Sequence, residues 1–411
     1  MKNKSDCNRV VKKYLDHYAE IEAQELESFP NTSYQNILLI PAFAETTGFL
    51  QRLLNNGPAP AAYSGKYLLI LVSNHPLNLP NPLLRQALAS HQKISQWLGK
   101  HSWVTGNLSL HHNEKFDTIL VNRIDPHGIP KSQGVGLARK IGADIATALF
   151  SRGNLCNPWV MSTDADTHLP PDYFDVVAPE NASALTYAFK HKLPDNAIGQ
   201  ATGLYESSIN HYISGLRQAA SPYAFHSVGS AQAINIFAYT GVRGYPKRSG
   251  GEDFYLLNKL AKIGEIVEIN TPIIEIDARI SDRVPFGTGP AVSRLLNSTD
   301  MFAERIFYHP ETFEYLKQVL EIFNASSLKN LGEKFYRLPH STQKCLSELG
   351  VDAALEHGQK QKLSGQTLGK HMHDWFDGFR TLRFVHLMRD QAFSNISQNE
   401  LRALNDQRKQ T

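Results

Sequence analysis

Residues 159–173 read Trp-Val-Met-Ser-Thr-Asp-Ala-Asp-Thr-His-Leu-Pro-Pro-Asp-Tyr. The first five residues read as a strand that opens on three apolar side chains, and this strand leads directly into Asp164 and Asp166. The prolines that follow force a turn. Because ligands of open α/β sheets bind outside the carboxyl ends of the strands, this stretch predicts a ligand site at the end of a buried strand.

The chain on either side of this stretch alternates between strand and helix patterns. Continuous apolar runs predict buried strands, and apolar residues at three- and four-residue spacing predict helices. Strands are expected over residues 36–41, 67–72 and 115–121, and helices over residues 81–98 and 135–150. This alternation predicts an α/β fold with a mostly parallel central sheet and flanking helices.

The same patterns divide the chain into three expected parts. Residues 1–30 are expected to form an N-terminal helix that ends at Pro30. Residues 31–295 are expected to form the α/β domain. Beyond the Gly- and Pro-rich segment 284–290 the pattern is almost wholly helical, which predicts a helical C-terminal region over residues 296–411.

Composition and charge limit the class of protein. The 411 residues are 42% hydrophobic and 20% charged, so the chain is expected to fold. A net charge of +3 argues against a nucleic-acid-binding protein. Three widely separated cysteines argue against a disulfide framework or a thiolate zinc site.

No apolar run approaches the ~20 residues that span a bilayer, and the N-terminus lacks a signal-peptide core. We therefore expect a soluble, cytoplasmic protein without a transmembrane segment.

Asp164 and Asp166 are candidate metal ligands. In an extended chain, residues two apart point to the same side, so both carboxylates would face one ligand. Carboxylate oxygens suit Mg²⁺ or Mn²⁺, which share their coordination with phosphates. The alternative is a solvated turn in which one of the two acids caps the next segment.

A second acidic cluster, Gly-Gly-Glu-Asp-Phe, occupies residues 250–254. An acid at a glycine-rich helix start can approach a ligand closely and act as a general base. Simple capping of the helix by Glu252 and Asp253 is the alternative.

Residues 134–142 read Gly-Val-Gly-Leu-Ala-Arg-Lys-Ile-Gly. The spacing of the third glycine, and the loop in place of a preceding strand, exclude the dinucleotide-binding fingerprint. Arg139 and Lys140 stand near a helix start, where they can balance the charge of a diphosphate. Solvation of both side chains at the surface is the alternative.

Taken in order, these segments resemble the family 2 nucleotide-sugar glycosyltransferases of the GT-A fold, of the soluble bacterial type. The similar motifs are the opening Ile40–Glu45, the Ala-Arg helix Gly134–Ala146, the metal motif Met161–Tyr173 and the acid motif Gly251–Gly264. The resemblance covers about residues 36–290. It implies a GT-A fold, Rossmann-like with a mostly parallel central sheet, for the α/β domain.

The resemblance also implies a role for each matched residue. Asp166 would bind the Mn²⁺ or Mg²⁺ that bridges the donor diphosphate, and Asp164 would contact the metal or the ribose. Asp253 would deprotonate the acceptor hydroxyl, with Glu252 beside it. The expected nucleotide-sugar-binding residues are Pro41, Ala42, Phe43, Glu45, Asn74, Arg139, Lys140, Asp164, Ala165 and Asp166. Asn74 stands where the family often has an aspartate that reads the base.

Three further residues are candidates for contacting a phosphate or the acceptor. Arg279 and Arg283 flank a short polar segment that leads to a Gly-Thr-Gly turn, and two arginines there suit a phosphate or carboxylate. A plain surface loop is the alternative. His226 is expected either at the acceptor or as a core or helix-cap histidine.

The expected activity is metal-dependent, inverting transfer of one sugar from a nucleotide-diphosphate sugar to an acceptor hydroxyl on a small molecule or glycan. The Gln-x-x-Arg-Trp motif of processive synthases is absent from the sequence, so non-processive transfer is expected. The alternatives are a sugar-phosphate nucleotidyltransferase and a catalytically degenerate GT-A domain that serves as a binding module. Donor sugar, nucleotide base, acceptor and oligomeric state are left open.

Overall fold

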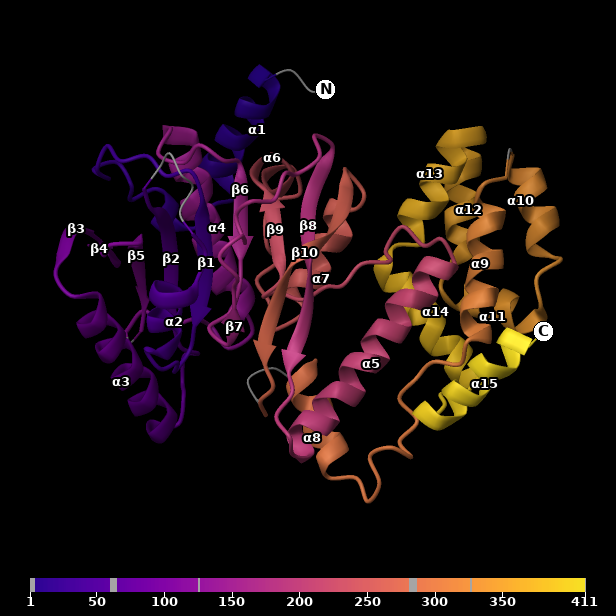
Figure 1. The fold of residues 1–411 in the computed structure, drawn as a ribbon. Helices are drawn as coiled ribbons and strands as arrows, with labels where there is room; N and C mark the ends of the chain where they lie inside the picture. Colours follow the sequence, from indigo (N-terminus) through magenta and orange to yellow (C-terminus); the bar gives the residue numbers. More distant parts are fainter. Residues whose placement is uncertain (1–3, 60–64, 125, 281–286, 326, 411) are drawn as a thin grey trace. The chain divides into compact units, whose positions relative to one another are not determined.

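The computed structural model describes residues 4–59, 65–124, 126–280, 287–325 and 327–410. The chain forms two compact units (Figure 1). The sheet unit comprises Met1–Lys192 and Ser227–Asp277, and the helical unit comprises Leu193–His226 and Ala278–Thr411.

The described part of the sheet unit holds one ten-stranded sheet in the order β3-β4-β5-β2-β1-β6-β9-β8-β10-β7. The strands are β1 Ile37–Ala42, β2 Tyr67–Asn74, β3 His101–Thr105, β4 Leu108–His112, β5 Phe116–Arg123, β6 Trp159–Ser162, β7 Thr167–His168, β8 Ala182–Lys192, β9 Gln232–Asn235 and β10 Glu265–Asp277. The central strands β5, β2, β1 and β6 are parallel neighbours, and most of the outer pairs are antiparallel. The predicted α/β class with a parallel central sheet is confirmed.

Helices cover both faces of this sheet (Figure 1). They are α1 Lys4–His17, α2 Gly48–Asn56, α3 Asn81–Leu98, α4 Gly134–Arg152, α6 Ile236–Gly241 and α7 Glu252–Leu260. Alternate residues of β1 face opposite sides, because side chains of a strand alternate. Leu38 and Ile40 join the apolar cluster that holds Phe49 of α2. Leu39 lies on the other face, against Gly142 of α4, where a Cβ atom would overlap the leucine side chain. Helix α4 therefore packs closely on the sheet.

The N-terminal helix is shorter than expected and belongs to the sheet unit. It ends at His17, and a 3₁₀ turn follows over Ile21–Ala23. The backbone N–H of Glu20 donates to Oδ2 of Asp144 on α4 at 2.8 Å. This contact to α4 replaces a bond within the helix, so the predicted continuation to Pro30 is wrong.

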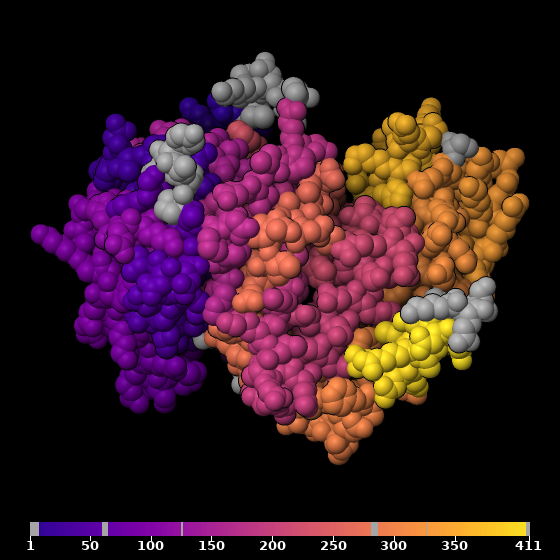
Figure 2. Space-filling view, in the orientation of Figure 1, coloured from indigo at the N-terminus to yellow at the C-terminus, as the bar shows by residue number. Residues whose placement is uncertain are grey.

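The helical unit contains α5 Ala197–Gln218, α8 Thr288–Leu296, α9 Glu311–Phe323, α10 Leu328–Phe335, α11 His340–Glu348, α12 Val351–Lys360, α13 Gly365–Trp375, α14 Gly378–Gln391 and α15 Gln398–Gln410. Leu216 of α5 shares one apolar core with Phe313, Phe323 and Phe376. In the space-filling view the orange and yellow segments of this unit pack against one another (Figure 2). The predicted helical C-terminal region is confirmed. The unit begins at residue 278 instead of near 295, and it also takes in α5, because apolar side chains of α5 pack into this core.

Within the described ranges, no helix combines the length and the apolar character needed to cross a bilayer.

The close packing of α4 on β1 gives a stability prediction. We expect Gly142→Leu to destabilise the protein by about 1–3 kcal/mol, because the added side chain overpacks the buried contact with Leu39. Ser151→Leu places the same side chain on an exposed position of α4 and serves as the control. Thermal melts compare the two variants. Equal melting temperatures would contradict this packing.

Candidate functional site

The carboxyl ends of β1, β2 and β6 meet at one edge of the sheet. Strand β1 pairs with both β2 and β6. The buried side-chain amide of Asn74, the last residue of β2, donates to the carbonyl oxygens of Ala42 at 3.3 Å and Val72 at 3.0 Å. Asp164 follows the end of β6. Asn74, Ala42 and Asp164 therefore lie at the edge where ligands of parallel sheets bind.

The guanidinium of Arg139 on α4 joins the two acidic motifs. Its Nη2 donates to Oδ1 of Asp164 at 2.6 Å, and its Nε donates to Oε1 of Glu252 at 2.9 Å. Its Nη1 donates to the hydroxyl of Ser162 at 2.6 Å. Arg139 is only 2% exposed. Because the donors of a guanidinium form a rigid planar fork, these bonds fix the end of β6 against the start of α7.

The charge of Arg139 is balanced by the protein itself. Burial acts to lower the pKa of Arg139, but the carboxylates of Asp164 and Glu252 outweigh burial and the pKa is raised. A buried charge persists only when it is paired and hydrogen-bonded in this way. The alternative of a solvated Arg139 at the helix start is therefore wrong.

Asp253 occupies the first turn of α7, directly after Glu252. The helix begins after Gly251, whose φ of 70° lies in the left-handed region that glycine adopts without strain. Oδ1 of Asp253 accepts the N–H of Phe254 at 2.7 Å. Burial, and after it the nearby negative charge of Glu252, raise the pKa of Asp253 to about 7. Near neutral pH this carboxyl can therefore both take up and release a proton.

The loop of Asp166 is anchored by three residues that the sequence did not single out. The backbone N–H of Asp277 donates to the carbonyl oxygen of Asp166 at 2.9 Å, and Oδ1 of Asp277 lies 2.7 Å from Nε2 of His168. Arg52 of α2 donates to the carbonyl oxygen of Ala165 at 2.6 Å. His168 carries a faint sequence signal, because it stands two residues after Asp166. Arg52 and Asp277 carry none, since they come from distant parts of the chain.

Asp164 and Asp166 remain the candidate metal ligands. One carboxylate oxygen of Asp164 is bonded to Arg139, and the side chain of Asp164 is 35% exposed. In the part of the chain that the structure describes, no three His, Cys, Asp or Glu side chains are grouped so that they could hold a metal ion. Mg²⁺ is usually bound by one or two carboxylates together with waters and substrate phosphates. The two aspartates fit a cation that is completed by a diphosphate and do not form a closed metal site.

Lys140 lies in a different environment from the one expected. Its Nζ donates to Oδ2 of Asp144 at 2.8 Å and to the hydroxyl of Tyr14 at 2.7 Å, and the side chain is buried. These bonds join α4 to α1. Lys140 therefore neither contacts a diphosphate nor lies solvated at the surface, as the two interpretations of the sequence had it, but connects two helices. The other expected donor-binding residues of this edge, Pro41, Phe43 and Glu45, are partly buried at the end of β1.

The remaining candidates belong to the helical unit or lie outside the described residues. Nε2 of His226 lies 2.9 Å from Oδ1 of Asn210 on α5. Arg279 is partly buried in the same unit. Arg283 lies outside the described residues. Their roles at a phosphate or at the acceptor remain predictions.

Comparisons with known proteins give structural likenesses at low sequence identity. No family model matches the chain, and no curated protein matches it. Among solved structures it is similar to S. aureus TarS 1–349 in complex with UDP-GlcNAc, with 10% identity, a TM-score of 0.36 and coverage of 87% of this chain and 92% of that chain. It is similar to the mannosyltransferase PcManGT from Pyrobaculum calidifontis in complex with GDP-Man and Mn²⁺, with 12% identity, a TM-score of 0.34 and coverage of 94% and 96%. A third is glucosyl-3-phosphoglycerate synthase from Mycobacterium tuberculosis, with 13% identity, a TM-score of 0.30 and coverage of 64% and 77%.

The bridge formed by Arg139 can be tested by a double-mutant cycle. We expect Arg139→Met to destabilise the protein by about 3–5 kcal/mol, because the buried carboxylate of Glu252 loses its cation. Adding Glu252→Gln should recover much of this loss, since the amide carries no charge to desolvate. Thermal melts of the native protein, both single variants and the double variant measure the coupling. Strictly additive effects would show that the two side chains do not depend on each other.

Proposed function

We propose that this chain is a metal-dependent, inverting glycosyltransferase of the GT-A type, similar to family 2, that moves one sugar from a nucleotide-diphosphate sugar to an acceptor hydroxyl. The observation that carries the proposal is the Arg139 bridge, which ties Asp164 of one acidic motif to Glu252 of the other. The bridge places an acid of raised pKa, Asp253, next to the motif that would receive a diphosphate. The ordered motifs of the sequence support the same activity.

The donor would lie at the carboxyl ends of β1, β2 and β6. Pro41, Ala42, Phe43 and Glu45 would border the nucleoside, and Asn74 would face the base. Asp164 and Asp166 would hold the Mn²⁺ or Mg²⁺. When bound, this cation would neutralise charge on the diphosphate. Asp277, His168 and Arg52 would keep the loop of Asp166 in place through the contacts described above.

Asp253 would act as the general base. The acceptor oxygen forms the new bond to the anomeric carbon as the bond from that carbon to the diphosphate oxygen breaks. The acceptor proton passes to the carboxylate of Asp253, and the nucleoside diphosphate leaves with the bonding electron pair. Attack on the face opposite the leaving group inverts the anomeric centre. A base with a pKa of about 7 suits this step. At neutral pH much of the Asp253 carboxyl is ionised, and the carboxylate still binds a proton well enough to take it from the acceptor.

The donor site can be tested by nucleotide binding. We expect UDP or GDP to bind the native protein with Mn²⁺ present, and the affinity to fall at least about tenfold when the metal is removed or Asp166 is replaced by asparagine. Asp175→Asn, an exposed aspartate of the same unit, is the matched control and should bind as the native protein does. Isothermal titration measures the nucleotide affinity of the native protein, with and without the metal, and of both variants. A native protein that binds neither nucleotide in a metal-dependent way would overturn the proposed function.

The base can be tested with Asp253→Asn. Loss of a general base is expected to lower kcat by about 10²–10⁴-fold with nucleotide binding unchanged. In the native protein, activity should rise with pH through about 7 and then level off, because the carboxylate is the active form. A screen of UDP- and GDP-sugars that detects released nucleoside diphosphate measures both the kcat of the variant and the pH dependence of the native protein.

A stability control separates catalysis from folding in this variant. The folded pKa of Asp253 lies above its ordinary value of 3.8, so ionisation of this group costs stability as pH rises through about 7. Asparagine carries no charge, so Asp253→Asn should melt no lower than the native protein at pH 8. Full transfer activity in this variant would remove Asp253 from the role of base. Nucleotide binding without transfer in the native protein would instead indicate the binding-module alternative.

A further inference from the structure

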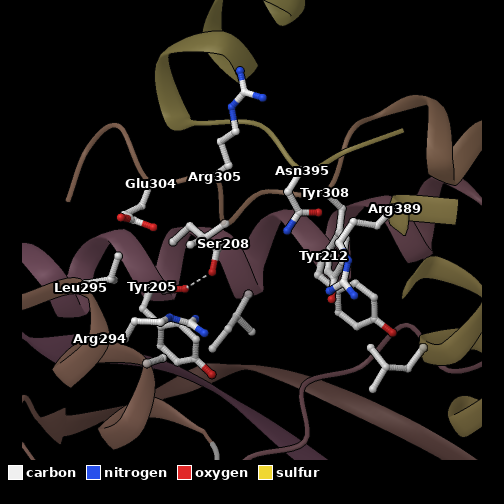
Figure 3. A pocket seen from close by; sticks show the side chains of 14 residues that line it. Tyr205, Ser208, Tyr212, Arg294, Leu295, Glu304, Arg305, Tyr308, Arg389 and Asn395 are labelled. Atoms are coloured by element: carbon white, nitrogen blue, oxygen red, sulfur yellow. Dashed lines mark hydrogen bonds between the residues drawn. The ribbon is translucent and has the colours of Figure 1, made fainter. Parts of the chain in front are cut away.

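The helical unit contains a cavity of about 460 Å³ (Figure 3). Helix α5 forms one wall, α8 and the segment around residues 304–308 form others, and α14 together with Asn395 after it completes the lining. The cavity has the size of a small-molecule pocket. Its residues lie entirely within the helical unit, and the proposed transfer reaction uses none of them.

One face of α5 lines this cavity with hydroxyl groups. Tyr205, Ser208 and Tyr212 follow one another at three- and four-residue spacing, which places them along one side of a helix. Ser208 donates to the carbonyl oxygen of Tyr205 at 2.7 Å. The hydroxyls of Tyr205 and Tyr212 make no hydrogen bond with any residue that the structure describes. Burial raises the pKa of both tyrosines, so they keep their protons at neutral pH and can donate to a ligand.

The charged groups of the lining differ in whether they are already paired. Arg389 bonds to Asp390 at 2.7 and 3.1 Å. Arg305 bonds to Glu400 at 2.8 Å and extends away from the other lining side chains (Figure 3).

Glu304 and Arg294 complete the charged lining. Glu304 accepts the hydroxyl of Ser298 at 2.6 Å. Arg294 of α8 lies beside the ring of Tyr205, and within the described ranges it has no ion pair or hydrogen bond (Figure 3). Arg294 is therefore the cation of this cavity that is left to bind a ligand.

The cavity also contains one hydrogen-bond acceptor that has no partner. Oδ1 of Asn395 is buried and has no hydrogen-bond partner among the described residues. The cavity thus combines one unpaired guanidinium, two tyrosine hydroxyls on aromatic rings and one unpaired amide oxygen. A guanidinium selects a carboxylate or phosphate, and the hydroxyl and amide groups suit a ligand that carries several hydroxyls.

We propose that this cavity binds an anionic saccharide, with its carboxylate or phosphate on Arg294 and its hydroxyls on Tyr205, Tyr212 and Asn395. The tyrosine rings supply the apolar surface on which the C–H face of a sugar packs. None of these residues belongs to the proposed donor site, and the proposal does not depend on the proposed transfer activity.

The test measures binding of four probes at one ionic strength and without nucleotide: glucuronic acid, glucose 6-phosphate, glucose and inorganic phosphate. Saturation-transfer NMR and calorimetry report the affinities. We expect one or both acidic sugars to bind at least about tenfold more tightly than glucose and than inorganic phosphate. The stronger acidic probe shows whether the anion is a carboxylate or a phosphate. Equal binding of inorganic phosphate, or no binding of either acidic sugar, would overturn the proposal.

Matched variants locate the site. Arg294→Gln should weaken the acidic sugars at least about tenfold, and Tyr205→Phe should weaken them less, because one neutral hydrogen bond is lost instead of a charged one. Arg402→Gln removes an exposed arginine of α15 in the same unit and should leave binding unchanged. Circular dichroism and melting temperature confirm that each variant is folded, and Arg294 is itself exposed, so its loss leaves the core intact. Unchanged binding in folded Arg294→Gln would overturn the proposal.

Discussion

The buried guanidinium of Arg139 holds two separate acidic motifs in one place. Taking a charge out of water is costly, and the attraction between charges repays that cost only with close geometry and full hydrogen bonding. Arg139 meets this condition through Asp164, Glu252 and Ser162. The end of β6 and the start of α7 therefore cannot shift independently, since any separation leaves a buried charge without its partner.

The position of Arg139 depends in turn on how α4 lies on the sheet. Gly142 lets the helix approach Leu39 of β1 closely. At its start, the N–H of Gly136 donates to the carbonyl oxygen of Arg248 at 2.9 Å, in the loop that precedes α7. Helix α4 is thus fixed at one point to the sheet and at another to the chain that carries the second motif. The parallel strands, the glycines of α4 and the arginine together determine where the carboxylates lie.

The sequence predicted the features that are encoded locally. Apolar runs indicated β1, β2, β5 and β6, and acids at a strand end and at a glycine-rich helix start indicated the two motifs. Where the surroundings of a side chain are made by residues distant in the chain, the neighbouring sequence shows no pattern that predicts them. Arg139 and Lys140 are neighbours in a helix, and nothing in their order shows that one joins Asp164 and the other joins Asp144. The sequence also did not predict that α5 belongs to the helical unit. This depends on packing against Phe313, which is distant in the chain.

The two adjacent acids of α7 show how one helix start can supply two electrostatic environments. Successive residues of a helix point in different directions around its axis, so Glu252 and Asp253 cannot both face Arg139. Glu252 forms the buried ion pair. For Asp253, burial and the negative charge of Glu252 raise the pKa and outweigh the lowering effects of the Phe254 N–H and of Arg139. The ion pair that secures the fold thus places a fixed negative charge beside the second acid, and this charge adds to burial in holding the pKa of Asp253 near the range that acid–base chemistry at neutral pH requires.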